Sequence, residues 1–348
     1  MSTERSSYLY ELPEELIATH PVSPRDSSRL LLMDRSSRHI HHKRFSTLPD
    51  MLDEDALLVI NNTRVIPARI PGQRKTGGAI EVLLVKEEKP GVWVCRVKNS
   101  GRLKQGEILE LGDKSLTAEF LDKNAEGDCT LRFNTGSELM DKLRDSGFAP
   151  LPPYIQKARK SFNERETDLN NYQTIFAKEY GAIAAPTAGL HFTGEVNGAL
   201  QDRGIEILEI TLHVGLGTFE PLRVDDINKH IMHEEAYEIS ETVAEKINTA
   251  KKSRRKIVAV GTTVTRTLES AWQDGSVKPG NAATRLFIHP PFRFNVVDQL
   301  LTNFHLPGST LIMLVAALAG REFVLEAYQE AIKQKYRFYS YGDCMLIQ

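Results

Sequence analysis

Cysteine is scarce in this 348-residue chain, since Cys95, Cys129 and Cys344 are odd in number and form no Cys-x-x-Cys pair. That usage fits a reducing compartment and offers no metal cage. The N-terminus lacks the apolar core of a secretory signal. The longest apolar run, Leu311 to Ala319, falls short of the ~20 residues that span a bilayer. We therefore expect a cytoplasmic protein with no membrane partner.

Several common catalytic motifs are also missing. Gly215-Leu-Gly217 lacks the third glycine of a dinucleotide fingerprint, and there is no Walker loop and no Gly-x-Ser-x-Gly elbow. His230 and His233 stand three residues apart but outside a His-Glu-x-x-His pattern, so we expect no metal site. These absences argue against the common nucleotide-binding, serine-hydrolase and zinc-hydrolase classes.

An excess of positive charge is absent too. The formal net charge is −2, with an isoelectric point near 6.6. Nucleic-acid binding would therefore need a local basic face rather than the overall charge. Four stretches are candidates, and the alternative for each is an ordinary solvated surface; they are 38–44, 64–75, 157–160 and 251–256.

The middle of the chain has the texture of an antiparallel barrel. Short apolar strands alternate with turns rich in Gly, Asn and Asp, at 80–85, 92–97, 108–111, 116–121 and 129–133. Several short strands separated by turn signals favour a small barrel. Pro71-Gly72 and Pro150-Leu-Pro-Pro153 are interpreted as hinges that bracket it.

The flanking sequence alternates helix and strand instead. We expect helices at 165–180, 193–203, 240–252 and 323–335, interleaved with apolar strands. The prediction is an α/β main domain with an inserted small antiparallel β-barrel domain. Its boundaries are 1–68 for the first segment of the main domain, 69–149 for the barrel and 150–348 for the second segment.

What the sequence does contain is a recurring pattern of apolar runs that end in Thr, His, Arg and Gly. The runs are 181–193, 207–219, 257–266 and 300–310. Open α/β sheets bind ligands outside the carboxyl ends of their strands. Glycine there lets the backbone approach a ligand, while histidine and arginine supply proton transfer and anion contacts. Four such clusters predict one shared site.

These motifs resemble the S-adenosylmethionine:tRNA ribosyltransferase-isomerase family of queuosine biosynthesis. The resemblance covers nearly the whole chain, and the string Ala185-Pro-Thr-Ala-Gly-Leu-His-Phe-Thr193 is its most specific part. Further matching segments are 25–30, 61–69, 150–154, 172–176, 212–219, 261–269, 302–307 and 336–343. The chain departs from the usual pattern at Pro290-Pro-Phe292, where Pro-Gly-Tyr is usual, and at Gly308 and Cys344.

The resemblance implies an activity and its substrates. S-adenosylmethionine would serve as cosubstrate, and its ribosyl group would move to the 7-aminomethyl-7-deazaguanine at the wobble position of tRNA. Isomerisation would give epoxyqueuosine-tRNA, with release of adenine and methionine and without a metal. No obligate protein partner is evident, which allows a monomer. Two alternatives remain open: an S-adenosylmethionine-dependent RNA methyltransferase and a non-catalytic RNA-binding protein.

This chemistry needs a base for the ribose C5′ proton beside the sulfonium and an acid for the departing adenine. His191, His213 and His305 are the catalytic candidates, because an imidazole serves both duties near neutral pH. The alternative for each is a structural histidine. Arg266 and the Gly261-Thr-Thr263 turn could hold the methionine carboxylate, or else form a helix cap and an ion pair.

The remaining candidates follow from the matched motifs. For substrate binding they are Arg64, Thr187, Gly189, Phe192, Gly215, Gly217, Thr218, Phe219, Thr262, Thr263, Arg266 and Asn303, with core packing as the alternative for the two phenylalanines. For tRNA binding they are Arg74, Lys75, Lys251, Arg254 and Lys256.

Overall fold

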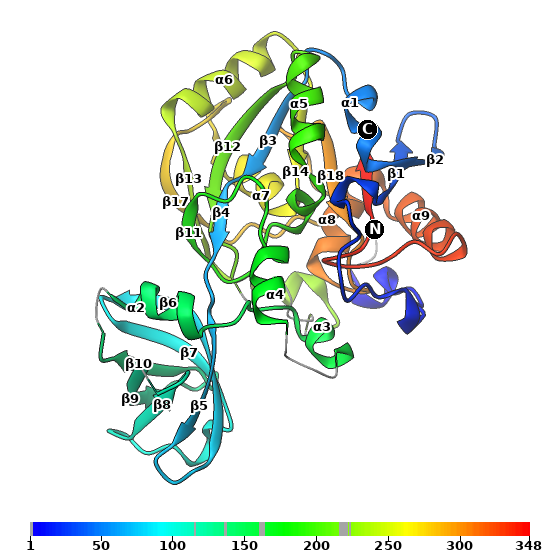
Figure 1. The fold of residues 1–348 in the computed structure, drawn as a ribbon. Helices are drawn as coiled ribbons and strands as arrows, with labels where there is room; N and C mark the ends of the chain where they lie inside the picture. Colours follow the sequence, from blue (N-terminus) through cyan, green and yellow to red (C-terminus); the bar gives the residue numbers. More distant parts are fainter. Residues whose placement is uncertain (1–2, 115, 136–137, 160–163, 216–221, 223) are drawn as a thin grey trace. The chain divides into compact units, whose positions relative to one another are not determined.

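A computed structural model describes residues 3–348 except 115, 136–137, 160–163, 216–221 and 223. The chain divides into two compact units (Figure 1). The first comprises residues 1–63, 174–179 and 186–348, and the second comprises residues 64–173 and 180–185. The second unit is thus inserted into the sequence of the first, as the sequence predicted for the fold class.

The first unit is built on a nine-stranded mixed sheet in the order β17-β13-β12-β3-β14-β18-β19-β1-β2. The strands are β1 (Arg29–Asp34), β2 (His39–Arg44), β3 (Leu57–Asn61), β12 (Glu206–Leu212), β13 (Glu235–Ile239), β14 (Ile257–Val260), β17 (Gly280–Thr284), β18 (Gln299–Asn303) and β19 (Cys344–Ile347). Every residue of β3, β14, β18 and β19 is buried. Strands that are covered on both faces have continuous apolar sequences, and such runs predicted these central strands.

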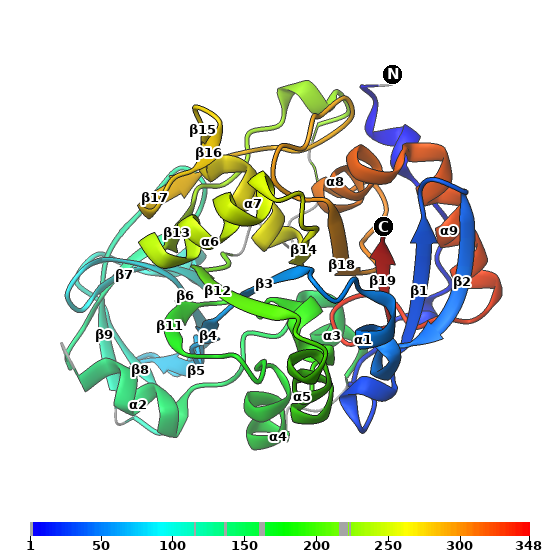
Figure 2. The same cartoon turned by 90° about the horizontal axis from the view of Figure 1, so that it is seen from above.

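Helices cover both faces of this sheet, as Figure 2 shows. Helices α1 (Leu48–Met51) and α5 (Gly194–Asp202) lie on one face, and α6 (Glu241–Lys252), α7 (Thr262–Ala271) and α8 (Thr310–Ala319) lie on the other. Helix α9 (Arg321–Lys333) follows α8, and β15 (Trp272–Gln273) and β16 (Ser276–Val277) form a small hairpin. On the α5 face, Leu58, Ile60, Val258, Val260 and Leu301 belong to one apolar cluster with Phe192 and Val196.

The second unit holds a closed, wholly antiparallel barrel in the order β10-β7-β6-β5-β8-β9. Its strands are β5 (Arg69–Arg74), β6 (Ala79–Lys89), β7 (Val92–Lys98), β8 (Ile108–Leu111), β9 (Leu116–Lys123) and β10 (Cys129–Phe133). Buried and more exposed residues alternate along β7, β8 and β9. A closed sheet has no free edge to pair with another chain. Helices α2 (Leu139–Ser146), α3 (Pro153–Ala158) and α4 (Arg165–Asn171) complete this unit.

The interpretation of Pro71-Gly72 as a hinge is wrong, because both residues lie inside β5. A Cβ atom at Gly72 would lie 2.4 Å from the Glu110 carbonyl oxygen, so glycine is required by the close approach of β8. The Pro71 carbonyl accepts a hydrogen bond from the Gly112 N–H, so this proline still takes part in a strand-edge contact.

The helix expected over 165–180 is also too long. Helix α4 ends at Asn171, and the short strands β4 (Thr63–Val65) and β11 (Glu179–Ala182) lie where the chain passes between the units. The Gln173 side chain accepts from the Val65 N–H and donates to the Val65 carbonyl, at 3.1 and 2.7 Å. This tertiary pairing fixes residue 173 outside a helix.

Candidate functional site

The carboxyl ends of four neighbouring strands meet at one edge of the nine-stranded sheet. Strands β12, β3, β14 and β18 pair in parallel, so their following loops emerge at the same edge. The chain reaches β12 from β3 by way of α5 on one face, and reaches β14 from β12 by way of α6 on the other (Figure 2). That reversal beside β3 is the position where open α/β sheets form a ligand crevice.

Strand register assigns the histidines to faces. Ile207 pairs with Leu58 and Val258 pairs with Leu58, and all three belong to or pack on the α5-face cluster. The pairing with β13 continues past the end of β12, because the His213 N–H donates to the Ala236 carbonyl, so alternation brings His213 to the same face as Ile207. Asn303 shares the face of Leu301, and its amide contacts His191 at 3.2 Å. His191 and His213 therefore lie on one face of the sheet.

The start of α7 offers free backbone donors at this edge. Gly261 is the N-cap with φ of +95°, a conformation that favours glycine, and no side chain of the described residues caps the helix. A Cβ atom at Gly261 would lie 3.7 Å from the Ala188 side chain, which places the 187–191 segment beside this turn. The first amide groups of a helix lack intrahelical partners and attract anions. Thr262 and Thr263 are 6% and 7% exposed, so such an anion would be largely shielded from water.

Arg266 lies one turn into α7 and is held by a buried ion pair. Its Nη1 donates to Glu235 of β13, and its Nε donates to the Leu286 carbonyl at 3.0 Å. Glu235 also accepts from the Gly215 N–H at 3.3 Å, which links the loop after β12 to α7. The Arg266 Nη2 is buried and makes no hydrogen bond to any residue that the structure describes. One charged donor therefore stays available beside the helix start.

His191 is buried and fully engaged. Its Nδ1 lies 2.8 Å from the Ser28 hydroxyl, and its Nε2 lies 3.2 Å from the Asn303 amide nitrogen. The same amide donates to the Tyr339 carbonyl at 3.0 Å. Because this nitrogen is the donor in both contacts, Nε2 must accept and Nδ1 must carry the proton. Burial, assisted by the Arg25 charge, lowers the pKa of His191 to about 3, so its ring is neutral.

The surroundings of His191 leave little room for a substrate. His191, Arg25 and Tyr341 line a recess of about 10 Å³, room for about one water molecule. The Asn303 Oδ1 is buried and accepts no hydrogen bond from the described residues, so it is an unpaired acceptor next to His191. His191 orients the Asn303 amide in this geometry, and its catalytic role stays a prediction.

His213 is the accessible member of the three predicted histidines, since it is only partly buried. Its Nδ1 lies 2.8 Å from the Thr63 hydroxyl, and no contact occupies its Nε2 among the described residues. Burial lowers the pKa of His213, while the nearby carboxylates of Glu179 and Glu238 act in the opposite direction. A half-buried imidazole with one orienting hydrogen bond and one free nitrogen has the arrangement of a general base.

His305 lies on the opposite face from His191. Its ring Nε2 is 2.9 Å from the hydroxyl of Thr302, and Thr302 and Asn303 point to opposite faces of β18. The backbone N–H of His305 donates to the Tyr328 hydroxyl of α9. Burial lowers the pKa of His305 to about 3. The structure thus brings His191 and His213 to one face of the shared edge and separates His305 from them.

Other predicted substrate-binding residues are placed less favourably. Phe192 is 1% exposed and packs edge-on against Phe45 and Phe176, with ring centroids 5.0 and 5.2 Å apart, which supports its core-packing alternative. A Cβ atom at Gly189 would lie 3.0 Å from Thr174, so this glycine serves a close approach. Arg64 stacks on the Tyr180 ring at 5.1 Å. Gly217, Thr218 and Phe219 lie outside the described residues.

The basic residues predicted for tRNA contact fall into two groups. Lys251 lies in the last turn of α6, and Arg254 and Lys256 follow between α6 and β14, at the amino edge of the sheet. Lys256 and Gly261 flank β14, and five residue steps at ~3.3 Å each set them roughly 16 Å apart. Arg74 lies on the barrel, where it forms a two-point ion pair with Glu107 at 2.6 and 2.9 Å. Lys75, Arg254 and Lys256 are exposed.

Sequence reasoning missed Glu235, Ser28 and Thr63. Glu235 was detectable, because residues 235, 237 and 239 alternate as the buried face of β13 and a buried acid requires a partner. Ser28 and Thr63 gave no comparable signal, since their contacts with histidines join residues 163 and 150 positions apart. Within the part of the chain that the structure describes, no three His, Cys, Asp or Glu side chains are placed to hold a metal, and no helix is long and apolar enough to cross a bilayer.

The chain is similar in sequence and in fold to proteins of known family. Residues 5–347 match the family model described as queuosine biosynthesis protein. An S-adenosylmethionine:tRNA ribosyltransferase-isomerase of Desulfitobacterium hafniense is 48% identical over 97% of this chain and 98% of its own. One from Thermotoga maritima is 45% identical over 98% of this chain and 99% of its own. The crystal structure of an S-adenosylmethionine tRNA ribosyltransferase from Thermotoga maritima has a TM-score of 0.56 at 36% identity, covering 99% of this chain and 100% of that one.

Proposed function

This chain belongs to the queuosine biosynthesis protein family, and we propose that it is a transferase-isomerase acting on S-adenosylmethionine and tRNA. It transfers and isomerises the ribosyl group of S-adenosylmethionine onto the 7-aminomethyl-7-deazaguanine at the tRNA wobble position. The products are epoxyqueuosine-tRNA, adenine and methionine. The observation that carries this proposal is the full-length similarity to relatives of that name. No metal and no obligate protein partner are required, and the cytoplasmic location remains a prediction.

The carboxyl edge of the sheet is the proposed cosubstrate site. The uncapped start of α7 receives the methionine carboxylate through the Thr262 and Thr263 N–H groups. The unpaired Nη2 of Arg266 supplies a second donor, while Glu235 holds the guanidinium in place. The free Oδ1 of Asn303 accepts from a ribose hydroxyl or an adenine amino group. Gly215 and Gly261 allow close approach of the backbone.

His213 is the proposed base. Its free Nε2 takes the ribose C5′ proton, which the adjacent sulfonium makes acidic, and Thr63 holds the ring by its Nδ1. Adenine departs with the glycosidic electrons and gains a proton. The aminomethyl nitrogen bonds to the ribosyl group and loses a proton, and the C5′ carbanion bonds to C1′ to close the carbon ring. The C1′ oxygen then bonds to C5′ to form the epoxide, while the electrons of the C5′–sulfur bond pass to sulfur and release methionine. His191 and His305 are positioning residues in this scheme, because burial keeps both rings neutral and hydrogen-bonded.

For tRNA, we propose that the exposed residues Lys75, Arg254 and Lys256 contact phosphates away from the chemistry. Arg74 and Lys251 are secondary, because Glu107 pairs with the first and Asp298 lies 3.8 Å from the second. Replacing Lys256 by Ala should weaken tRNA binding modestly and reduce the slope of log K against log salt by about one unit. Arg74→Ala is the matched comparison and should leave that slope unchanged. Equal salt-dependence slopes in wild type and Lys256→Ala would show that tRNA binds to another surface of the protein.

Product analysis tests the proposed reaction. Purified protein, tRNA carrying the deazaguanine precursor and labelled S-adenosylmethionine should release adenine and methionine in equal amounts. A methyltransferase would release S-adenosylhomocysteine instead, and a binding protein would release nothing. Either of those outcomes would overturn the proposal.

A further inference from the structure

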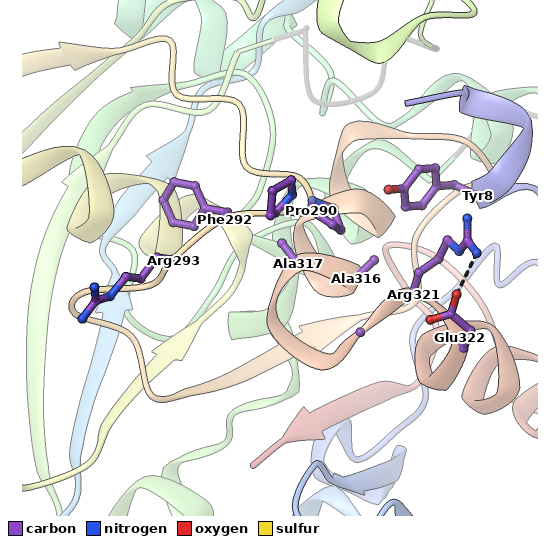
Figure 3. A pocket seen from close by; sticks show the side chains of 10 residues that line it. Tyr8, Pro290, Phe292, Arg293, Ala316, Ala317, Arg321 and Glu322 are labelled. Carbon is purple, nitrogen blue, oxygen red and sulfur yellow. Dashed lines mark hydrogen bonds and ion pairs between the residues drawn. The ribbon is translucent and has the colours of Figure 1, made fainter. Parts of the chain in front are cut away.

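A cavity of about 480 Å³ lies in the first unit, between the N-terminal segment and the corner where α8 passes into α9. Figure 3 shows Tyr8, Pro290 and Phe292 around it, with Ala316 and Ala317 as its floor. Its size is within the ~300–1,000 Å³ of pockets that bury small ligands. Neither the proposed base nor the α7 start lines it.

The walls are flat and largely unsaturated or cyclic. Tyr8 contributes one aromatic ring, and the half-buried Phe292 contributes another that rests edge-on against Phe294 with centroids 5.0 Å apart. Pro290 lies between them (Figure 3), and Pro291 also lines the cavity. Ala316, Ala317 and Gly320 have side chains too short to fill the space. Walls of this kind suit a planar ring rather than a branched aliphatic group.

Tyr8 also brings an unpaired polar atom into the cavity. The residue is 1% exposed, and its hydroxyl is directed toward Pro290 in Figure 3. Its hydroxyl hydrogen-bonds to no residue that the structure describes. A hydroxyl that faces a cavity without a protein partner can donate to or accept from a ligand atom.

The rim adds charged groups of both signs. Arg321 and Glu322 begin α9 and form an ion pair at 2.7 Å, drawn as a dashed line in Figure 3. A hydrogen bond from its own backbone N–H and the hydrogen bond from Arg321 lower the pKa of Glu322, so the carboxylate is ionised at neutral pH. A carboxylate beside the helix start disfavours a bare anion there and accepts from N–H donors.

We propose that this cavity binds a nucleobase, with its ring in the space lined by Tyr8, Pro290 and Phe292. A ring nitrogen or carbonyl accepts from the Tyr8 hydroxyl, and an amino or imino N–H donates to Glu322. A purely apolar ligand would leave the Tyr8 hydroxyl unpaired, and a simple anion would meet the Glu322 carboxylate. A nucleobase supplies a flat ring, an acceptor and a donor together. The base is either part of a free nucleoside or an unstacked base of an RNA, since both present the same chemistry.

The inference does not depend on the proposed chemistry at the carboxyl edge, because none of those residues lines the cavity.

Saturation-transfer NMR on the full-length protein provides the test, with adenosine and guanosine as free probes and an RNA stem-loop in a parallel binding assay. Ala317→Leu fills the cavity from its floor. Ala319→Leu is the matched control, because Ala319 lies two residues further on the same helix, is partly exposed, and does not line the cavity. Tyr8→Phe removes only the hydroxyl. Thermal melting of each variant verifies that it is folded.

We expect Ala317→Leu to abolish the nucleoside signal, Ala319→Leu to keep it, and Tyr8→Phe to weaken binding about five- to tenfold. If the nucleosides fail to bind but the stem-loop loses at least fivefold affinity in Ala317→Leu alone, the base comes from RNA and the inference still holds. If wild type and both alanine variants behave alike toward every probe, the cavity binds no nucleobase. That result would leave the adenine and methionine assay of the proposed function untouched.

Discussion

The two edges of the nine-stranded sheet differ in how they treat charge. At the carboxyl edge, Glu235 and Arg266 are paired with side chains only 5% and 6% exposed. At the amino edge, Glu206 pairs with Lys246 at 2.7 Å and is 33% exposed. Exposed pairs contribute little to stability, whereas burying charge is expensive unless each group is satisfied. The unpaired polar atoms and the buried ion pair at the carboxyl edge support our proposal that the cosubstrate binds there.

The largest effect should come from the one accessible histidine of the carboxyl edge. His213→Gln should lower the turnover of adenine release by roughly 10²- to 10⁴-fold, the usual contribution of a general base. Its folded stability should change little because the residue is only partly buried. Single-turnover assays with saturating tRNA measure this, with His39→Gln on the exposed strand β2 as control. Undiminished turnover in His213→Gln would remove this residue from the chemistry.

The ion pairs of the two edges should respond very differently to truncation. Glu235→Ala leaves the Arg266 charge buried without its partner, so the free energy of unfolding should fall by about 3–5 kcal/mol. Glu206→Ala, which removes an exposed carboxylate, should cost under ~1 kcal/mol. Urea denaturation of both variants measures the difference. Similar losses of unfolding free energy in the two variants would show that the buried and the exposed ion pair do not differ in their contribution to stability.

The pH dependence of stability should report the neutral His191. Its folded pKa, about 3, lies below the unfolded value of ~6.5, so the unfolded chain binds more protons between these values. Stability is therefore fully present above pH 6.5 and is lost as the pH falls, by roughly 2 kcal/mol at pH 5. His191→Gln should flatten this decline, and His39→Gln should not. Melting temperatures from pH 7 to pH 5 test this, and identical profiles in all three proteins would contradict it.

The sequence predicted best those features that depend on the pattern within a single strand or helix. The inserted barrel was predicted from alternating strands, and both that fold class and the family resemblance are confirmed. Helices α7 and α8 were missed. The apolar run of α8 shows no amphipathic period, and α7 starts with threonine and valine residues, which are typical of strands and continue the apolar run of β14. The separation of His305 from His191 depends on whether each contacts Thr302 or Asn303, which are neighbours in sequence on opposite faces of β18.

The roles of the site residues remain predictions. The property that the sequence could not predict is how exposed each candidate histidine is. All three histidines follow apolar runs in the same way, so the sequence could not distinguish the half-buried His213 from the buried His191 and His305. That difference arises from residues distant in the chain, such as Ser28 for His191 and Tyr328 for the His305 backbone. Domain boundaries at 68 and 149 likewise remain predictions.

The central claim is that S-adenosylmethionine binds at the start of α7, and one backbone N–H tests it. Thr262→Pro removes that donor while proline suits the first helical position, and Gly261 already has the ψ of 156° that a following proline requires. Glu241→Pro makes the same change at the start of α6, after Ser240 with ψ of 157°. Thr262→Ala controls for the lost side chain.

Isothermal titration of S-adenosylmethionine into these three variants is the decisive measurement. The account predicts that Thr262→Pro raises the dissociation constant about tenfold, equivalent to ~1.4 kcal/mol, while Glu241→Pro and Thr262→Ala stay near wild type. All variants should melt within a few degrees of wild type. A dissociation constant for folded Thr262→Pro equal to that of wild type would contradict the placement of the cosubstrate at this edge.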